Sequence, residues 1–439
     1  MKLAKLSMVA IAVLGLGGHA YAADTLEEAF KNGKVTGDLR FVYTAGSQTG
    51  ATVQTAPTNN VNVGSVAAEL RYVTDSFNNF KLGLGFQSAH DLDFQKRDAL
   101  NANDYTSEDD ARNSVSTTLL SEAYLQYNFL KSNIAVGRQK IKTPLIMTSS
   151  VFALEDSFDA AVLNFNEIPD TMVKLMYIQD WKMRYSSEAV GATQQDEHFS
   201  DGMYSVFFIN KTISGLTLDG QYLTTNENKR LYDAPVFIGA GGYDEYYLQA
   251  EYKLPISYPL SLAVTYAGAN YETGNYANPG PNTVGGDHAQ LLGFKVATEV
   301  TGIKLNLAYT TMDDEANFPG TFGHVPDAVA YTDMLTNNAI FAGVDAYSIE
   351  AIYDFGIPGF SSALKYGYFT QSAQGIINSG NMNMDGTKEI TIDLKYAFSG
   401  VLKGFHTRLW AGYSTYDALA MPSGNDDFLY GRFYINYKF

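Results

Sequence analysis

Charged side chains occupy every second position of short apolar stretches throughout this 439-residue sequence. In the last twelve residues, FLYGRFYINYKF, Arg432 and Lys438 alternate with Phe433 and Tyr437. A period of two indicates an extended strand with one polar face and one apolar face. A row of such charges is suited to attracting or repelling ions that pass close by, and not to breaking covalent bonds.

The residues that covalent catalysis needs are not arranged for it. Histidine occurs five times after residue 22, each time singly, and neither an H-E-x-x-H nor a G-x-S-x-G motif is present. The glycine-rich run 239–242 lacks the Lys-Ser/Thr pair of a phosphate-binding loop. We therefore do not expect an enzyme. The five histidines are His90, His198, His288, His324 and His406.

Four carboxylates cluster in the polar segment 90–118, and carboxylate oxygens are ligands that Ca²⁺ accepts. Their spacing does not follow the twelve-residue calcium-loop pattern, so a solvated acidic loop is the stronger interpretation. Calcium is a weak candidate, and the sequence indicates no other cofactor. The four residues are Asp104, Glu108, Asp109 and Asp110.

The elements that position these charges are eighteen candidate strands, joined by connections that alternate between short and long. A membrane barrel with both termini in the periplasm has this pattern, with short periplasmic turns and long extracellular loops. Tyr and Phe at the ends of the apolar faces match the aromatic girdles of such barrels. We predict an all-β, transmembrane antiparallel β-barrel in which 23–439 form a single domain. The strands are predicted to begin near Lys34, Gly64, Phe80, Leu119, Asn133, Phe158, Met172, Asp201, Leu216, Tyr243, Leu260, His288, Ile303, Val344, Ser361, Thr387, Phe405 and Asp427.

A barrel of this size encloses a water-filled channel unless something folds into it. Basic residues on the predicted inward faces would line the channel. Acidic residues nearly balance them, so the wall alone leaves the preferred sign of ion open, and these charges could simply solvate the lumen. The basic candidates are Arg40, Arg71, Lys365, Lys395, Arg408 and Arg432.

The third long connection, 141–157, is the candidate constriction. Basic residues at its start and acidic residues at its end could face each other across an eyelet. An ordinary surface loop is the other interpretation. The candidate residues are Arg138, Lys140, Lys142, Glu155 and Asp156.

Residues 1–22 have the organisation of a secretory signal peptide. Lys2 and Lys5 precede an apolar run from Ser7 to Gly18, and Ala20-Tyr21-Ala22 matches an A-x-A cleavage site. The apolar run is too short to span a bilayer, although a short anchor helix is a competing interpretation. We expect export through the Sec pathway to the outer membrane of a Gram-negative cell.

The formal net charge of −17 argues against nucleic acid as a partner, and the absence of cysteine means that the fold is stable without disulfides. The expected partners are the lipid bilayer, lipopolysaccharide and small hydrophilic solutes that diffuse through the channel. A monomer and a homotrimer both stay open. The alternative function is a surface adhesin or structural barrel with a filled lumen.

Two segments resemble a known family. Arg138 to Ile146 (RQKIKTPLI) and Phe158 to Trp181 are similar to OprD-like outer-membrane porins, and the first 43 residues resemble the major outer-membrane porins of Campylobacter-type bacteria. The resemblance implies eighteen strands, a third loop folded inward, a basic ladder on one wall, and passive uptake of small nutrients that often bear a carboxylate. It would place Arg138, Lys140 and Lys142 near the constriction. The sequence departs from the family pattern in its even balance of lumenal acids.

Overall fold

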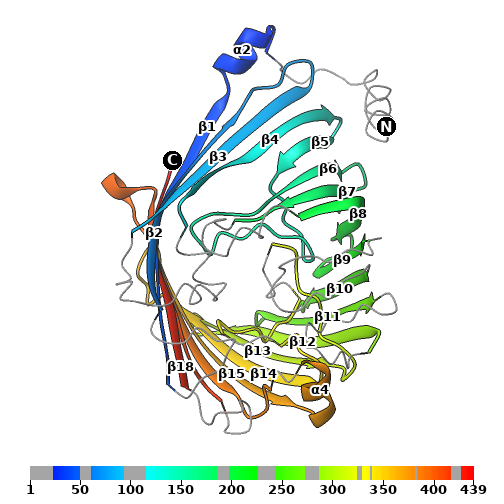
Figure 1. Cartoon of the computed structure of the whole chain (residues 1–439), viewed down its shortest axis with the longest axis vertical. Helices are drawn as coiled ribbons and strands as arrows, with labels where there is room; N and C mark the ends of the chain where they lie inside the picture. The colour runs from blue at the N-terminus through cyan, green and yellow to red at the C-terminus, as the bar shows by residue number, and fades with distance from the viewer. Residues whose placement is uncertain are drawn as a thin grey trace.

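The computed structural model describes residues 23–49, 61–92, 115–184, 197–225, 243–271, 286–323, 329–336, 339–380, 383–416 and 427–439. Eighteen strands form one antiparallel sheet in which each strand pairs with the next, and β18 (Asp427–Lys438) pairs with β1 (Lys34–Thr49). The sheet is therefore a closed barrel, seen in Figure 1 as a ring around central loops. The other strands are β2 (Val61–Val73), β3 (Phe80–Asp91), β4 (Thr117–Phe129), β5 (Ser132–Gln139), β6 (Ser157–Phe165), β7 (Thr171–Lys182), β8 (Glu197–Asn210), β9 (Leu216–Thr225), β10 (Tyr243–Lys253), β11 (Leu260–Tyr271), β12 (His288–Val300), β13 (Ile303–Met312), β14 (Val344–Tyr353), β15 (Phe360–Gln371), β16 (Lys388–Ala397) and β17 (Phe405–Thr415).

This arrangement confirms the predicted eighteen-stranded antiparallel barrel. The largest difference in a strand start is at β8, which begins at Glu197 and not at Asp201. Helices are short: α2 (Leu26–Lys31), whose N-terminus is closed by a capping box of Thr25 and Glu28, α4 (Ala373–Asn378) and the 3₁₀ turn η2 (Gly400–Leu402). In the part of the chain that the structure describes, no helix has the length and apolar character needed to cross a membrane.

Apolar and charged side chains lie on opposite faces of the barrel wall. Leu39 and Leu248, on β1 and β10, have 49% and 52% of their surface exposed on the outside. Arg40, next to Leu39, and Glu245, three residues before Leu248, are buried on the inside. This arrangement suits a wall between lipid and water. The closed ring also pairs the backbone N–H and C=O groups of neighbouring strands, as the hydrocarbon layer requires.

The connections are short at one end of the barrel and long at the other. At the short end, β12 and β13 are joined by Thr301 and Gly302, both with positive φ, as a tight hairpin turn requires. Aromatic side chains gather at this end: the ring centroids of Phe405 and Tyr437 are 4.7 Å apart, and those of Tyr396 and Phe398 are 4.8 Å apart. This is the girdle expected where a barrel wall meets the membrane interface.

Part of the barrel interior is filled by an apolar core. Leu145 and Ile146, from the connection between β5 and β6, are fully buried there against Phe318 and Phe322 from the connection between β13 and β14. Trp181 of β7 packs edge-on against Phe322 with ring centroids 5.8 Å apart. Both connections therefore belong to the interior of the barrel, where Figure 1 shows them in cyan-green and yellow.

Candidate functional site

The segment 140–156, here called the crossing loop, runs across the barrel from one wall to the other. On one side, Arg40 of β1 donates to the Phe152 carbonyl at 2.7 Å. On the other side, the Gln221 side chain of β9 accepts from the Leu145 amide at 2.8 Å. Because β1 and β9 lie almost half the ring apart, these two tethers stretch the loop across the lumen.

Charges at the root of the crossing loop hold one another in their ionised forms. The Lys140 ammonium donates to Glu69 and, at 2.7 Å, to Glu155, which also receives the Arg40 guanidinium at 3.2 Å. Burial disfavours the charged amine, but Glu155 and Glu69 outweigh it and raise the pKa of Lys140. Burial likewise disfavours the carboxylate, but Lys140 and Arg40 hold the pKa of Glu155 below its usual value.

These pKa shifts predict that the crossing loop stays anchored between about pH 5 and about pH 9. Glu155 has a lowered pKa, so its contribution is present above 4.5 and is lost as pH falls through the lower folded value. Lys140 has a raised pKa, so its contribution is present below 10.5 and is lost only as pH rises through the higher folded value. Single-channel conductance should be flat across this window and change in stronger acid. A conductance step near neutral pH would contradict this prediction, because it would mean that a group other than Lys140 and Glu155 controls the loop.

Asp156 anchors the end of the crossing loop and does not face water. It is fully buried, as is Arg184, whose guanidinium lies 3.5 Å away and whose amide donates to the other carboxylate oxygen at 3.1 Å. The same guanidinium lies 4.4 Å from the centre of the Phe152 ring. A pair buried in this way fixes the loop in place and is out of reach of a passing ion.

Arg138 lies on the outer face of β5, which corrects its expected place at the eyelet. It forms a two-pronged pair with Asp159 of β6, with both nitrogen–oxygen distances at 2.8 Å. In the sheet register Arg138 lies opposite Asp159, whose sequence neighbours Phe158 and Ala160 are buried in the interior core, so the pair faces outward. Lys142 is solvent-exposed within the crossing loop.

Basic side chains face the interior from six neighbouring strands. They belong to the set expected from the sequence, and each strand from β15 through β18 and on to β1 and β2 supplies one. Most have acidic partners; Arg71, for example, reaches across Gly85 of β3 to Glu122, with nitrogen and oxygen 2.6 Å apart. In strand order the six are Lys365, Lys395, Arg408, Arg432, Arg40 and Arg71.

A tryptophan holds two of these arginines in line. The guanidinium carbons of Arg408 and Arg432 lie 4.4 and 5.7 Å from the centre of the Trp410 ring. Arg432 also lies 4.4 Å from the ring of Phe152, so the arginine row touches the crossing loop. Cation–π contacts of this kind fix the positions of the charges without neutralising them.

A second inward segment, 329–336, here called the strap, lies along the inner face of β12 to β17. The Lys365 ammonium donates to the backbone carbonyls of Tyr331 and Asp333 at 3.2 and 2.6 Å. The buried Glu389 carboxylate accepts from the amide of Thr336 at 3.2 Å. Gly367 of β15 leaves room for the strap, because a Cβ there would come within 2.9 Å of a strap methionine.

The strap is not evident from the sequence, because the start of this connection has the acidic composition of a solvated loop. Only the three acids at its start, residues 313–315, fit that composition. The signal that could have revealed the strap is a run of large apolar residues, which a solvated loop has no reason to carry. These residues include Phe318, Phe322, Met334, Ile340 and Phe341, all of them buried.

The crossing loop and the connection that carries the strap meet inside the barrel. The Met147 amide donates to the Phe322 carbonyl at 2.7 Å, and the Phe322 amide donates to the Leu145 carbonyl at 3.1 Å. The next residue, Gly323, has a φ of 96°, and a Cβ there would lie 1.8 Å from the Met147 carbonyl oxygen. Only glycine permits this approach. The two loops therefore narrow the lumen together.

The comparisons with known proteins agree with this architecture. A family model described as outer membrane porin, OprD family, matches residues 92–439. The chain belongs to the OprD family of outer membrane porins. Members of this family are channels and not enzymes, so the chain is an outer-membrane porin that passes small solutes.

Solved structures of Pseudomonas aeruginosa porins share the fold at low sequence identity. OpdO aligns with a TM-score of 0.69 and 14% identity over 94% of this porin and 98% of its own chain. OccK11 (OpdR) aligns at 0.68 and 14% over 95% and 99%. OpdK, solved with vanillate, aligns at 0.67 and 13% over 92% and 98%. No curated protein sequence matches the chain.

Two sequence predictions lie outside the described residues. The first is the signal peptide at 1–22, and with it the route of export. The second is the weak calcium site, whose four carboxylates fall between residues 92 and 115.

Proposed function

We propose that this porin carries small hydrophilic solutes by passive diffusion and prefers those that bear a carboxylate. The observation that carries the proposal is the row of basic side chains, one from each of six neighbouring strands. Along such a row a carboxylate can pass from one basic side chain to the next and stay close to a positive charge throughout. Charged channel walls select ions by this kind of electrostatic attraction. That OpdK was solved with vanillate, a carboxylate, supports the same preference.

The charges where the crossing loop narrows the lumen support selection among solutes over unselective diffusion. The crossing loop brings its own charged root, Lys140 and Glu155, beside Arg40 of the row. A solute that passes this point must therefore come close to fixed charges, where electrostatic selection is strongest. The apolar outer face is the surface that we propose meets membrane lipid and lipopolysaccharide.

Influx into liposomes that contain the purified porin tests this proposal. Gluconate and glucose have similar size and differ in one carboxylate, so gluconate should enter faster per protein. Arg138→Gln, which changes charge on the outer face only, should leave the ratio of the two rates unchanged. Faster entry of glucose would contradict the carboxylate preference. Entry of neither solute would favour the alternative of an adhesin with a filled lumen.

A further inference from the structure

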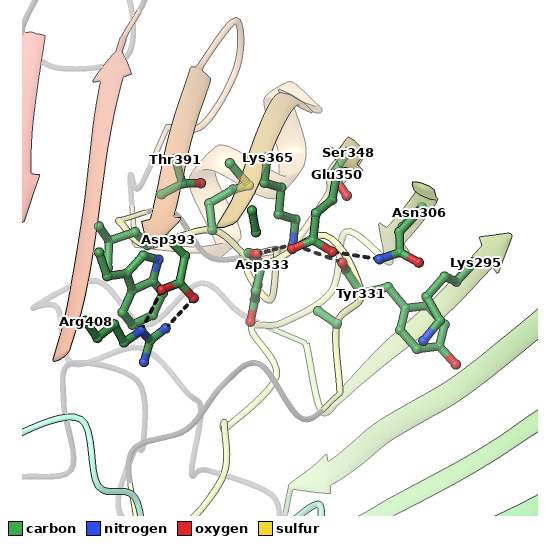
Figure 2. A pocket seen from close by; sticks show the side chains of 16 residues that line it. Lys295, Asn306, Tyr331, Asp333, Ser348, Glu350, Lys365, Thr391, Asp393 and Arg408 are labelled. Carbon is green, nitrogen blue, oxygen red and sulfur yellow. Dashed lines mark hydrogen bonds and ion pairs between the residues drawn. The ribbon is translucent and has the colours of Figure 1, made fainter. Parts of the chain in front are cut away.

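A cavity of about 330 Å³ lies between the strap and the inner wall of β12 to β17. Its volume is at the lower end of the range for ligand pockets, so it suits one small solute. Figure 2 shows its charged side chains, which come from the wall and from the strap. Three are basic and three are acidic: Lys295, Lys365 and Arg408, and Asp333, Glu350 and Asp393.

Most of these charges are already engaged within the protein. Arg408 donates two hydrogen bonds, of 2.8 and 2.9 Å, to the carboxylate of Asp393. Lys365 donates to two strap carbonyls, and Asp333 accepts from the Ala339 amide at 2.8 Å. These four groups shape the pocket and hold the strap in place.

The acid of Glu350 is available to a ligand cation. One of its oxygens accepts from the Asn306 side chain at 2.7 Å, a neutral donor. Lys365 lies directly opposite Glu350 on β15, but its ammonium donates to the two strap carbonyls. Among the described residues, Glu350 forms no ion pair with a basic side chain. The carboxylate is thus positioned by Asn306 but not neutralised by it.

The ammonium of Lys295 is available to a ligand anion. It lies 4.7 Å from the centre of the Tyr331 ring, a contact that orients a cation without neutralising it. In the described part of the chain, Lys295 has no carboxylate within ion-pair distance. Lys295 lies on β12 and Glu350 on β14, two strands away, and Glu350 is two residues along β14 from the position in register with Lys295. Ideal strand geometry then places their Cα atoms about 12 Å apart.

We propose that this pocket binds a small zwitterion, whose ammonium pairs with Glu350 and whose carboxylate pairs with Lys295. Figure 2 shows Glu350, Asn306 and Lys295 in a row along the wall, with Tyr331 beside Lys295. A molecule with two carboxylates would place one of them against Glu350, and a molecule with two ammonium groups would place one against Lys295. The pocket therefore selects against both by repulsion. This inference rests on the proposed channel function and narrows its solute class.

Three four-carbon probes test the inference in liposomes that contain the purified porin. 4-Aminobutanoate is a zwitterion, succinate carries two carboxylates, and 1,4-diaminobutane carries two ammonium groups. We expect the initial influx rate of 4-aminobutanoate to saturate with concentration, as binding to a site requires. The rates of the other two probes should rise linearly over the same range.

Two variants assign the binding to the named side chains. Glu350→Gln keeps the partner of Asn306 but removes the charge, and Lys295→Met removes the ammonium. Each should raise the half-saturating concentration of 4-aminobutanoate about tenfold, as the loss of one charge-assisted hydrogen bond predicts. The controls Glu299→Gln and Lys304→Met make the same changes on the same wall, where the two residues face each other outside the pocket. They should leave that concentration unchanged.

Linear influx of all three probes would overturn the zwitterion site and leave the channel function standing. Influx of none would overturn the channel function itself. If the pocket variants fail to form barrels, which heat-dependent gel mobility reveals, the comparison of the three probes in the unmodified porin decides alone. Equal effects of the pocket and control variants would also overturn the site.

Discussion

Replacing Arg40 with alanine is expected to release the crossing loop from the β1 wall and to raise single-channel conductance. The Arg40 side chain is only 6% exposed and donates to the Phe152 carbonyl and to the carboxylates of Asp38 and Glu155. Its removal leaves those acids in a confined site with Lys140 as the remaining cation. Breaking a buried pair in this way costs about 3–5 kcal/mol. We therefore expect the loop to move away from β1, although Tyr434 still donates to the Val151 carbonyl.

Recordings in planar bilayers check this expectation. Arg138→Ala is the matched control, because Arg138 has an equally close ion pair but lies on the outer face. Its conductance should match that of the unmodified porin. A folded Arg40→Ala barrel with unchanged conductance would mean that the loop does not depend on this arginine.

Neutralising Arg408 and Lys395 together should turn the channel toward cations. Both pair with Asp393, at 2.8 Å each, so this group of three carries a net charge of +1. The double variant with glutamine leaves Asp393 alone and changes the local charge to −1. A unit charge at 4 Å contributes about 1 kcal/mol even in water, so the ratio of cation to anion permeability should rise by about fivefold or more per unit charge.

Reversal potential in a salt gradient measures this change. Glu299→Gln with Lys304→Gln is a suitable control, because it removes one charge of each sign at the short-turn end of the same lumen. That variant should leave the reversal potential near its original value. An unchanged value in the Arg408 and Lys395 variant would place this pair away from the path of the ions.

The barrel could be predicted because its determinants are local. Each strand shows its two faces within about ten residues, and the length of each connection shows which end it occupies. The same local rule decides the faces of single residues once a strand boundary is known. Arg138 was expected near the constriction because the family resemblance grouped it with Lys140 and Lys142, whereas β5 continues to Gln139 and pairs Arg138 with Asp159 on the outer face.

The lumen could not be predicted in the same way, because its contacts join residues far apart in sequence. The tether between Gln221 and Leu145 spans 76 positions, and that between Arg40 and Phe152 spans 112. No periodic pattern encodes such pairs. The pocket acid Glu350 was one of many inward charges in the sequence, and its availability depends on which neighbours already have partners.

We infer that two inward loops narrow this barrel without closing it. Single-channel recording of the unmodified porin in a planar bilayer is the decisive experiment. We expect stepwise, ohmic conductance that is smaller than that of the same barrel after Arg40→Ala. A folded barrel that gives no steps at all would show that the loops seal the lumen, and would contradict the account.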